Sequence, residues 1–172
     1  PQLHHVFFPF DCSRLRMRPE PPVSRPVRIG HAPTSRAAKG SDQILPVLRR
    51  LSEEEGIEVA LIEGMRYEAA LALKGSCDIF VDQIGELGYG INSLEALAMT
   101  IPAASCLAPG FAAAYPDHPF VEVQAATLYE ALLRLIGDGE LRRRLGREGR
   151  AWVAAHHDSR AVVRRIHTLA GL

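Results

Sequence analysis

The chain has 172 residues, of which 47% are hydrophobic and 23% are charged, a composition typical of one globular domain with a substantial core. Its 20 basic residues balance its 20 acidic ones, which argues against nucleic acid or an anionic membrane as a partner. No apolar run approaches the roughly 18 residues of a transmembrane helix, and the three separated cysteines indicate reduced thiols in a cytoplasmic protein.

The first 26 residues are rich in proline and arginine, and no hydrophobic period runs through them. This composition predicts an extended segment, not a packed element. We therefore place a domain boundary near Pro26 and expect residues 27–172 to form one folded unit. Because the sequence begins at Pro1, we also expect it to be part of a longer protein.

From Val27 onward, short apolar runs alternate with longer segments of helical periodicity. This alternation is typical of a parallel sheet flanked by helices, an α/β Rossmann-like fold. The predicted strands span Val27 to His31, Ile57 to Ile62, Asp78 to Val81, Ile101 to Ser105 and Phe120 to Val123. The predicted helices between them span Ser41 to Glu55, Tyr67 to Gly75, Asn92 to Met99 and Thr127 to Ile136.

Two further helices, joined around His156 to Ser159, are predicted between Asp138 and Leu172. No strand follows them, so we expect them to pack on the outside of the sheet or on another domain.

The loop after the first predicted strand is the first candidate site. In such sheets, ligands bind at the carboxyl ends of the strands, and this loop contains His31, Arg36 and Lys39 before Gly40 and a helix. A lysine beside a helix N-terminus suits a diphosphate, because the helix adds backbone donors to the positive charge. The alternative is a solvated loop in which Lys39 has no special role.

The second candidate site follows the next strand. Glu63, Gly64 and Met65 would form a shallow ledge for a flat ring. The alternative is a plain strand-to-helix turn in which Gly64 has a positive φ.

The segment GYGINSLEALAMTIP, from Gly88 to Pro102, is the most informative stretch of the chain. Gly88 and Gly90 allow a tight turn and a close approach to a ligand. The apolar residues of the following helix leave Glu95 near its first turn, beside unpaired N–H groups. The segment thus predicts an anion site with an acceptor for hydroxyls. The alternative is that Glu95 is a buried structural carboxylate that caps its own helix.

Neither a metal site nor a nucleic-acid surface is predicted. His156 and His157 are adjacent on a helix, so they point in different directions, and no third ligand lies at a suitable spacing. The basic run from Arg142 to Arg150 is interleaved with acids and lacks aromatic residues, which indicates a solvated helix face.

These residues together resemble the carboxyl-terminal, nucleotide-sugar-binding domain of retaining GT-B glycosyltransferases, the group called family 4 or group 1. The resemblance covers almost the whole chain, and the pairing of the loop RAAKGSDQIL with the motif Gly-x-Gly-x4-Glu-Ala carries it. The first segment resembles the linker between the two domains of such enzymes. The last helix resembles the one that crosses back toward the amino-terminal domain.

The resemblance implies the donor half of an enzyme that transfers a sugar, of the hexosyl type, from a nucleotide diphosphate-sugar with retention. The acceptor would bind mostly to a missing amino-terminal domain, so the isolated chain is expected to be inactive. No metal or other cofactor is implied. Two alternatives stay open: a degenerate, non-catalytic binding module, and a nucleotide-sugar epimerase of GT-B fold, for which His31 is the sole candidate.

The resemblance also implies roles for single residues. Lys39 would contact the diphosphate, the backbone from Gly88 to Gly90 would lie against the phosphates and the sugar, and Glu95 would accept from the ribose hydroxyls. The complete set of candidate site residues is Arg36, Lys39, Glu63, Gly64, Met65, Gly88, Tyr89, Gly90 and Glu95.

The chain departs from the family pattern at three positions. Thr34 stands where the family has an arginine, and the nearby Arg36 is the candidate to substitute for that arginine. Leu87 stands where the first acid of the Glu-x7-Glu pattern belongs, with Glu86 displaced by one residue, and Thr100 replaces a glycine. The loss of the first acid favours the non-catalytic alternative.

Overall fold

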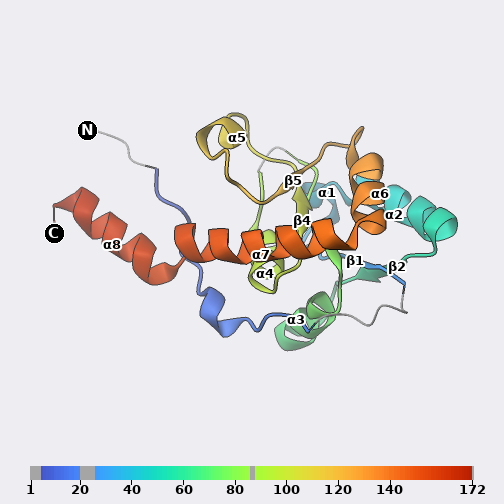
Figure 1. Ribbon diagram of the computed structural model, residues 1–172, viewed down its shortest axis with the longest axis horizontal. Coiled ribbons are helices and arrows are strands. Elements are labelled where there is room, and N and C mark those ends of the chain that lie inside the picture. The colour runs from blue at the N-terminus through green and yellow to red at the C-terminus, as the bar shows by residue number, and fades with distance from the viewer. Residues whose placement is uncertain (1–4, 20–25, 86–87, 172) are drawn as a thin grey trace.

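The computed structural model describes residues 5–19, 26–85 and 88–171 (Figure 1). Its centre is a parallel sheet with the strand order β2-β1-β3-β4-β5. The strands are β1 (Arg28–His31), β2 (Glu58–Leu61), β3 (Ile79–Val81), β4 (Ala103–Ser105) and β5 (Val121–Glu122). The predicted α/β class and all five predicted strands are confirmed. The strand order changes direction between β1 and β3, and such switch points are where ligands bind.

The longer helices lie where hydrophobic periodicity predicts them. They are α2 (Ser41–Glu55), α3 (Tyr67–Gly75), α4 (Ile91–Ala98), α6 (Leu128–Gly137), α7 (Gly139–His156) and α8 (Ser159–Ala170). The shorter turns α1 (Arg36–Lys39), α5 (Phe111–Ala114) and the 3-10 helix η1 (Cys12–Arg14) were not predicted. Segments this short do not complete a hydrophobic period, so the sequence pattern does not reveal them.

Helices cover both faces of the sheet. One core joins α2 and α6 to the sheet through Ile44, Leu48 and Leu132. The other joins α4 and α7 to the opposite face through Leu97 and Trp152. Figure 1 shows α7 running across the sheet and α8 extending beyond it, so both terminal helices lie outside the sheet, as expected.

The segment 5–19 packs against this second core, so the prediction of an unpacked segment is wrong for these residues. Cys12 and Leu15 are buried in the α4–α7 core. The backbone N–H of Phe10 donates to the carbonyl oxygen of His157 over 2.7 Å. The packing was missed because these apolar residues follow no regular period; they fill the surface along α4 and α7. The domain boundary near Pro26 stays a prediction.

Within the described ranges, no helix combines the length and the apolar character that a membrane crossing requires. The cytoplasmic location expected from the cysteines stays a prediction.

Candidate functional site

A cavity of about 670 Å³ lies at the carboxyl ends of β1 and β2, beside the switch point. We call it the Lys39 cavity. Its walls come from the loops after β1 and β2, from α3 and from the start of α4. The lining includes the candidate residues Lys39, Glu63, Gly64, Met65 and Glu95 and three residues that were not predicted, Tyr67, Lys74 and Asn92. The fold thus brings together candidates from three separate segments of the chain.

Lys39 is held in this cavity by a buried acid. Its Nζ donates to Oδ1 of Asp82 over 2.7 Å, while Oδ2 accepts from the backbone N–H of Gly90 (2.7 Å) and from Oγ of Ser93 (2.8 Å). The Asp82 side chain is fully buried. Asp82 therefore ties the Lys39 loop to the turn before α4. The sequence does contain a signal for Asp82, because a charged residue directly follows the buried strand β3.

Gly90 leaves room for this ion pair. A Cβ at this position would lie 2.9 Å from Nζ of Lys39 and 3.2 Å from Oδ2 of Asp82. The backbone of Gly90 is extended, with φ −117° and ψ −175°, so its conformation alone would permit other residues. Gly88, in contrast, has φ 72°, the left-handed region that favours glycine. Gly88 therefore makes the predicted tight turn, and Gly90 provides room for the chain's own side chains.

Glu95 occupies a different position from the predicted one. The helix α4 begins at Ile91, so Glu95 is its fifth residue and lies beyond the first turn. Its carboxylate does not cap the helix either. Instead, it forms a buried ion pair with Lys74 through Oε2 and accepts from the hydroxyl of Tyr67 through Oε1 over 3.0 Å. The prediction that Glu95 lies beside free N–H groups is wrong; the alternative is confirmed in that Glu95 is a buried carboxylate with structural partners, and is wrong in that it caps no helix.

Lys74 is almost completely buried, although lysines at helix ends are normally solvated. Its ammonium also donates to Oδ1 of Asn92 over 2.7 Å and lies 4.9 Å from the ring centre of Phe80. Burial lowers the pKa of Lys74, and the neighbouring Glu95 opposes this shift. Burial, together with the Glu95 carboxylate, raises the pKa of Tyr67.

Arg36 and Glu63 pair with each other at the rim of the cavity. Nε and Nη2 of Arg36 donate to the two carboxylate oxygens of Glu63 over 2.8 and 2.6 Å, and this pairing holds the pKa of Glu63 below its usual range. Gly64 has φ 62°, as the plain-turn alternative predicted. Met65 is 41% exposed on the cavity wall, which leaves an apolar ledge available.

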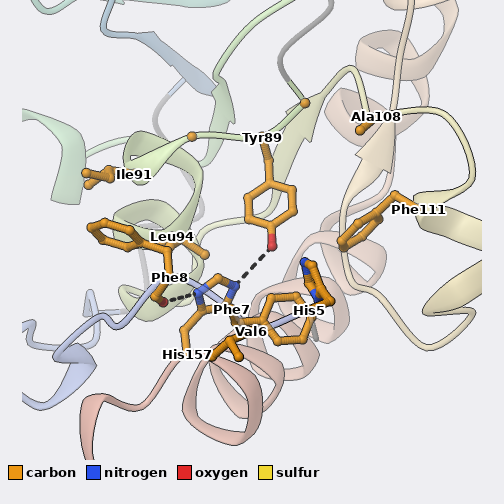
Figure 2. A pocket seen from close by; sticks show the side chains of 12 residues that line it. His5, Val6, Phe7, Phe8, Tyr89, Ile91, Leu94, Ala108, Phe111 and His157 are labelled. Carbon is orange, nitrogen blue, oxygen red and sulfur yellow. Dashed lines mark hydrogen bonds between the residues drawn. The ribbon is translucent and has the colours of Figure 1, made fainter. Parts of the chain in front are cut away.

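A second cavity, of about 410 Å³, lies beside the Gly88–Gly90 turn (Figure 2). We call it the aromatic cavity; Ile91 lines both cavities, so the two adjoin. The ring of Tyr89 points into it, and its hydroxyl lies 3.1 Å from Nε2 of His157. Nδ1 of His157 lies 2.7 Å from the carbonyl oxygen of Phe8. Because that carbonyl can only accept, Nδ1 carries the proton, and Nε2 accepts from Tyr89.

Burial lowers the pKa of His157 and raises that of Tyr89. The Tyr89 side chain thus belongs to the aromatic cavity. The charged candidates Lys39, Glu63 and Glu95 line the Lys39 cavity, and Arg36 lies at its rim through its pairing with Glu63.

The remaining histidine candidate is structural. His31 is fully buried, and its ring nitrogens lie 2.9 Å from the carbonyl oxygen of Val81 and 2.8 Å from Oγ of Ser41. Both ring nitrogens are thus engaged, which leaves the epimerase alternative without its candidate. Among residues 5–19, 26–85 and 88–171, no three His, Cys, Asp or Glu side chains lie together so as to hold a metal ion. Glu86 and Leu87 lie outside the described residues.

No protein-family model and no curated protein sequence matches the chain. Solved structures do match. Sucrose-phosphate synthase from Thermosynechococcus elongatus has 16% identity and a TM-score of 0.70, over 96% of this chain and 51% of that one. Anabaena HepE in complex with UDP has 16% identity and a TM-score of 0.70, over 97% and 57%. HepE is also known in complex with UDP-glucose.

The chain spans about half the length of these two proteins. The C-terminal domain of a group 1 glycosyl transferase family protein from Francisella tularensis has 17% identity and a TM-score of 0.53, over 89% of this chain and 96% of that one. Identities this low establish the fold alone. The chain has the Rossmann-like fold of the C-terminal domain of GT-B glycosyltransferases.

Proposed function

We propose that this chain is the donor-binding domain of a retaining glycosyltransferase and that it binds a nucleotide diphosphate-sugar in the Lys39 cavity. One observation carries the proposal: a cavity at the switch point contains both a cation, Lys39, and a carboxylate, Glu95, which suit a diphosphate and a ribose. HepE, a protein of the same fold, has been solved in complex with UDP and with UDP-glucose, and these complexes support the proposal.

The contacts suggest how the ligand lies. The diphosphate faces Lys39 near the N-terminus of α4. The ribose faces Glu95, whose two oxygens each bind one protein donor and so retain acceptor capacity. The base lies on the ledge of Gly64 and Met65. The sugar is then directed past Ile91 toward the aromatic cavity, since Ile91 is common to both cavities.

The chemistry assigned to this domain is electrostatic. As the bond between sugar and diphosphate breaks, negative charge develops on the departing diphosphate, and Lys39 and the N-terminus of α4 stabilise that charge. We assign no nucleophilic role to the described residues at the cavity; the Tyr67 hydroxyl, which donates to Glu95 over 3.0 Å, serves to hold that carboxylate in place. The acceptor and the closure that excludes water belong to a preceding domain, so the isolated chain is expected to bind the donor without transferring its sugar.

Calorimetry with UDP, ADP, GDP and the matching monophosphates tests the proposal. A charge-assisted hydrogen bond is worth about 1.5–3 kcal/mol, so Lys39→Ala should weaken diphosphate binding roughly 10- to 100-fold. Arg50→Ala is the matched control, because it removes one positive charge from an exposed ion pair on α2. Equal affinity for diphosphates and monophosphates, or an unaffected Lys39→Ala variant, would contradict the proposal.

A second function, a non-catalytic module of the same fold, is favoured by one observation. The charges of Lys39 and Glu95 are each matched inside the domain, by Asp82 and by Lys74. A domain that no longer binds a donor would keep such pairs for stability. Sugar transfer by the longer protein would exclude this alternative, whereas a longer protein that neither binds nor turns over any nucleotide-sugar would support it.

A further inference from the structure

In the ion pair between Lys39 and Asp82, only the lysine faces the cavity. Lys39 lines the cavity and its side chain is 13% exposed, whereas the Asp82 side chain is 0% exposed. The Asp82 carboxylate is fixed by Gly90 and Ser93 as well as by Lys39. The ammonium has three donors, of which one is used at Asp82. A ligand in the cavity therefore meets the cation first, with a fixed negative charge directly behind it.

The other charged groups at the cavity do not offset this negative charge. Glu95 is paired with Lys74, and Glu63 is paired with Arg36 at the rim. The three pairs together leave no net charge. Asp82 therefore cancels part of the attraction that Lys39 exerts on a phosphate, and the buried setting keeps solvent from screening the repulsion.

This repulsion grows with the charge of the ligand. A nucleoside diphosphate has an ionisable terminal oxygen that is esterified in the corresponding nucleotide-sugar, so it carries more negative charge. We propose that Asp82 is a specificity-determining residue that competes with the diphosphate for Lys39 and thereby disfavours the bare nucleoside diphosphate more than its sugar ester. This role rests on the proposed function: it would favour donor over product in the same cavity.

The test is calorimetry on the Asp82→Asn variant with UDP, UDP-glucose and inorganic pyrophosphate. The variant should bind pyrophosphate and UDP about tenfold more tightly than the unchanged chain does. UDP-glucose should gain less, so the preference for UDP-glucose over UDP should fall. Adding Lys39→Met to the variant should abolish the gain in affinity, because the ammonium for which Asp82 and the phosphate compete is then absent.

The control is Glu58→Gln, which changes the net charge by the same amount. Glu58 pairs with Arg28 at the amino-terminal end of β2, the opposite end of the strand from the cavity. The Glu58→Gln variant should leave the affinities for UDP, UDP-glucose and pyrophosphate unchanged. If Asp82→Asn does not fold, Asp82→Ser removes the same charge and keeps a hydroxyl acceptor. In the unchanged protein, pyrophosphate should also shift the carboxyl carbon resonance of Asp82, because it draws Lys39 away.

The outcomes separate this proposal from the function on which it rests. If no nucleotide binds but Asp82→Asn binds pyrophosphate more tightly, the proposed function and the discrimination between donor and product both fail, whereas the competition between Asp82 and a phosphate for Lys39 stands. If nucleotides bind but Asp82→Asn shows unchanged or weaker affinity for UDP and pyrophosphate, the role of Asp82 is refuted. An equal gain for UDP and UDP-glucose, or an Asp82 resonance that UDP and pyrophosphate leave unshifted, also refutes it.

Discussion

The buried pair of Lys74 and Glu95 should contribute strongly to the stability of the domain. Their side chains are 2% and 7% exposed. Removing one partner of such a pair leaves the other charge buried without compensation, which costs about 3–5 kcal/mol. The Glu95→Gln variant keeps a neutral acceptor for Tyr67 and Lys74, so we expect a loss near the lower limit, about 3 kcal/mol. For a chain of this size, that corresponds to a decrease of about 6–12 °C in Tm.

A double variant tests whether the loss of unfolding free energy comes from the buried Lys74 charge that is left without a partner. Adding Lys74→Met to Glu95→Gln removes the second charge and fills its volume with an apolar side chain. This should recover about 2 kcal/mol of the unfolding free energy. Urea denaturation followed by the fluorescence of Trp152, the one tryptophan of the chain and a buried residue, measures both steps. A double variant no more stable than Glu95→Gln would refute the reasoning.

The same double variant separates the two roles of Glu95. Because most of its stability should return, a loss of ligand binding by this variant is not explained by unfolding; the Lys74→Met single variant shows how much of the loss comes from Lys74, which also lines the cavity. If Glu95 accepts from the ribose, the double variant should discriminate less between UDP and 2′-deoxy-UDP than the unchanged chain does. Glu68→Gln, which neutralises an exposed acid on α3, is the control and should leave this discrimination intact. An undiminished preference for UDP would leave Glu95 with a structural role only.

Three further predictions concern single positions. Burial lowers the pKa of His31 and His157 below 6.5, so just below that pH the unfolded chain binds more protons than the folded chain does. As the pH is lowered from 6.5, the unfolding free energy should therefore fall by at most about 1.4 kcal/mol per pH unit for each histidine, which urea titrations at several pH values measure. The His157→Gln variant should show a smaller slope. Gly90→Ala should displace Lys39 and cost about 1–3 kcal/mol in a urea titration. Thr100 has φ 65°, so Thr100→Gly should raise the unfolding free energy by about 1 kcal/mol in the same titration.

The sequence predicted the elements whose signal is local. The period of Ile44, Leu48 and Leu51 and the glycine at position 56 are sufficient to predict α2 at its observed bounds. The convergence of Lys39 and Glu95 on one cavity was also predictable, because both follow strands that meet at one edge of a parallel sheet.

The partners of the site residues could not be predicted in the same way. Lys74 lies in the last turn of α3, where a lysine normally remains in water. It is buried here because α3 packs beside α4, a relation between segments that no local period encodes. The same holds for Asp82, whose side-chain partners come from two other segments, the Lys39 loop and the start of α4. The positive φ of Thr100 was not predicted either, although the glycine that the family pattern has at this position is a signal for it.

The hydrogen bond between Phe10 and His157 has a consequence for folding. It joins residues far apart in the chain, and contacts of this kind form late because a long loop must close first. During synthesis the first segment leaves the ribosome well before α7 is complete. Cys12 and Leu15 share a core with Trp152 and Val153 of α7, so they stay without their final packing until α7 appears, and until then chaperones and proteases can reach this segment.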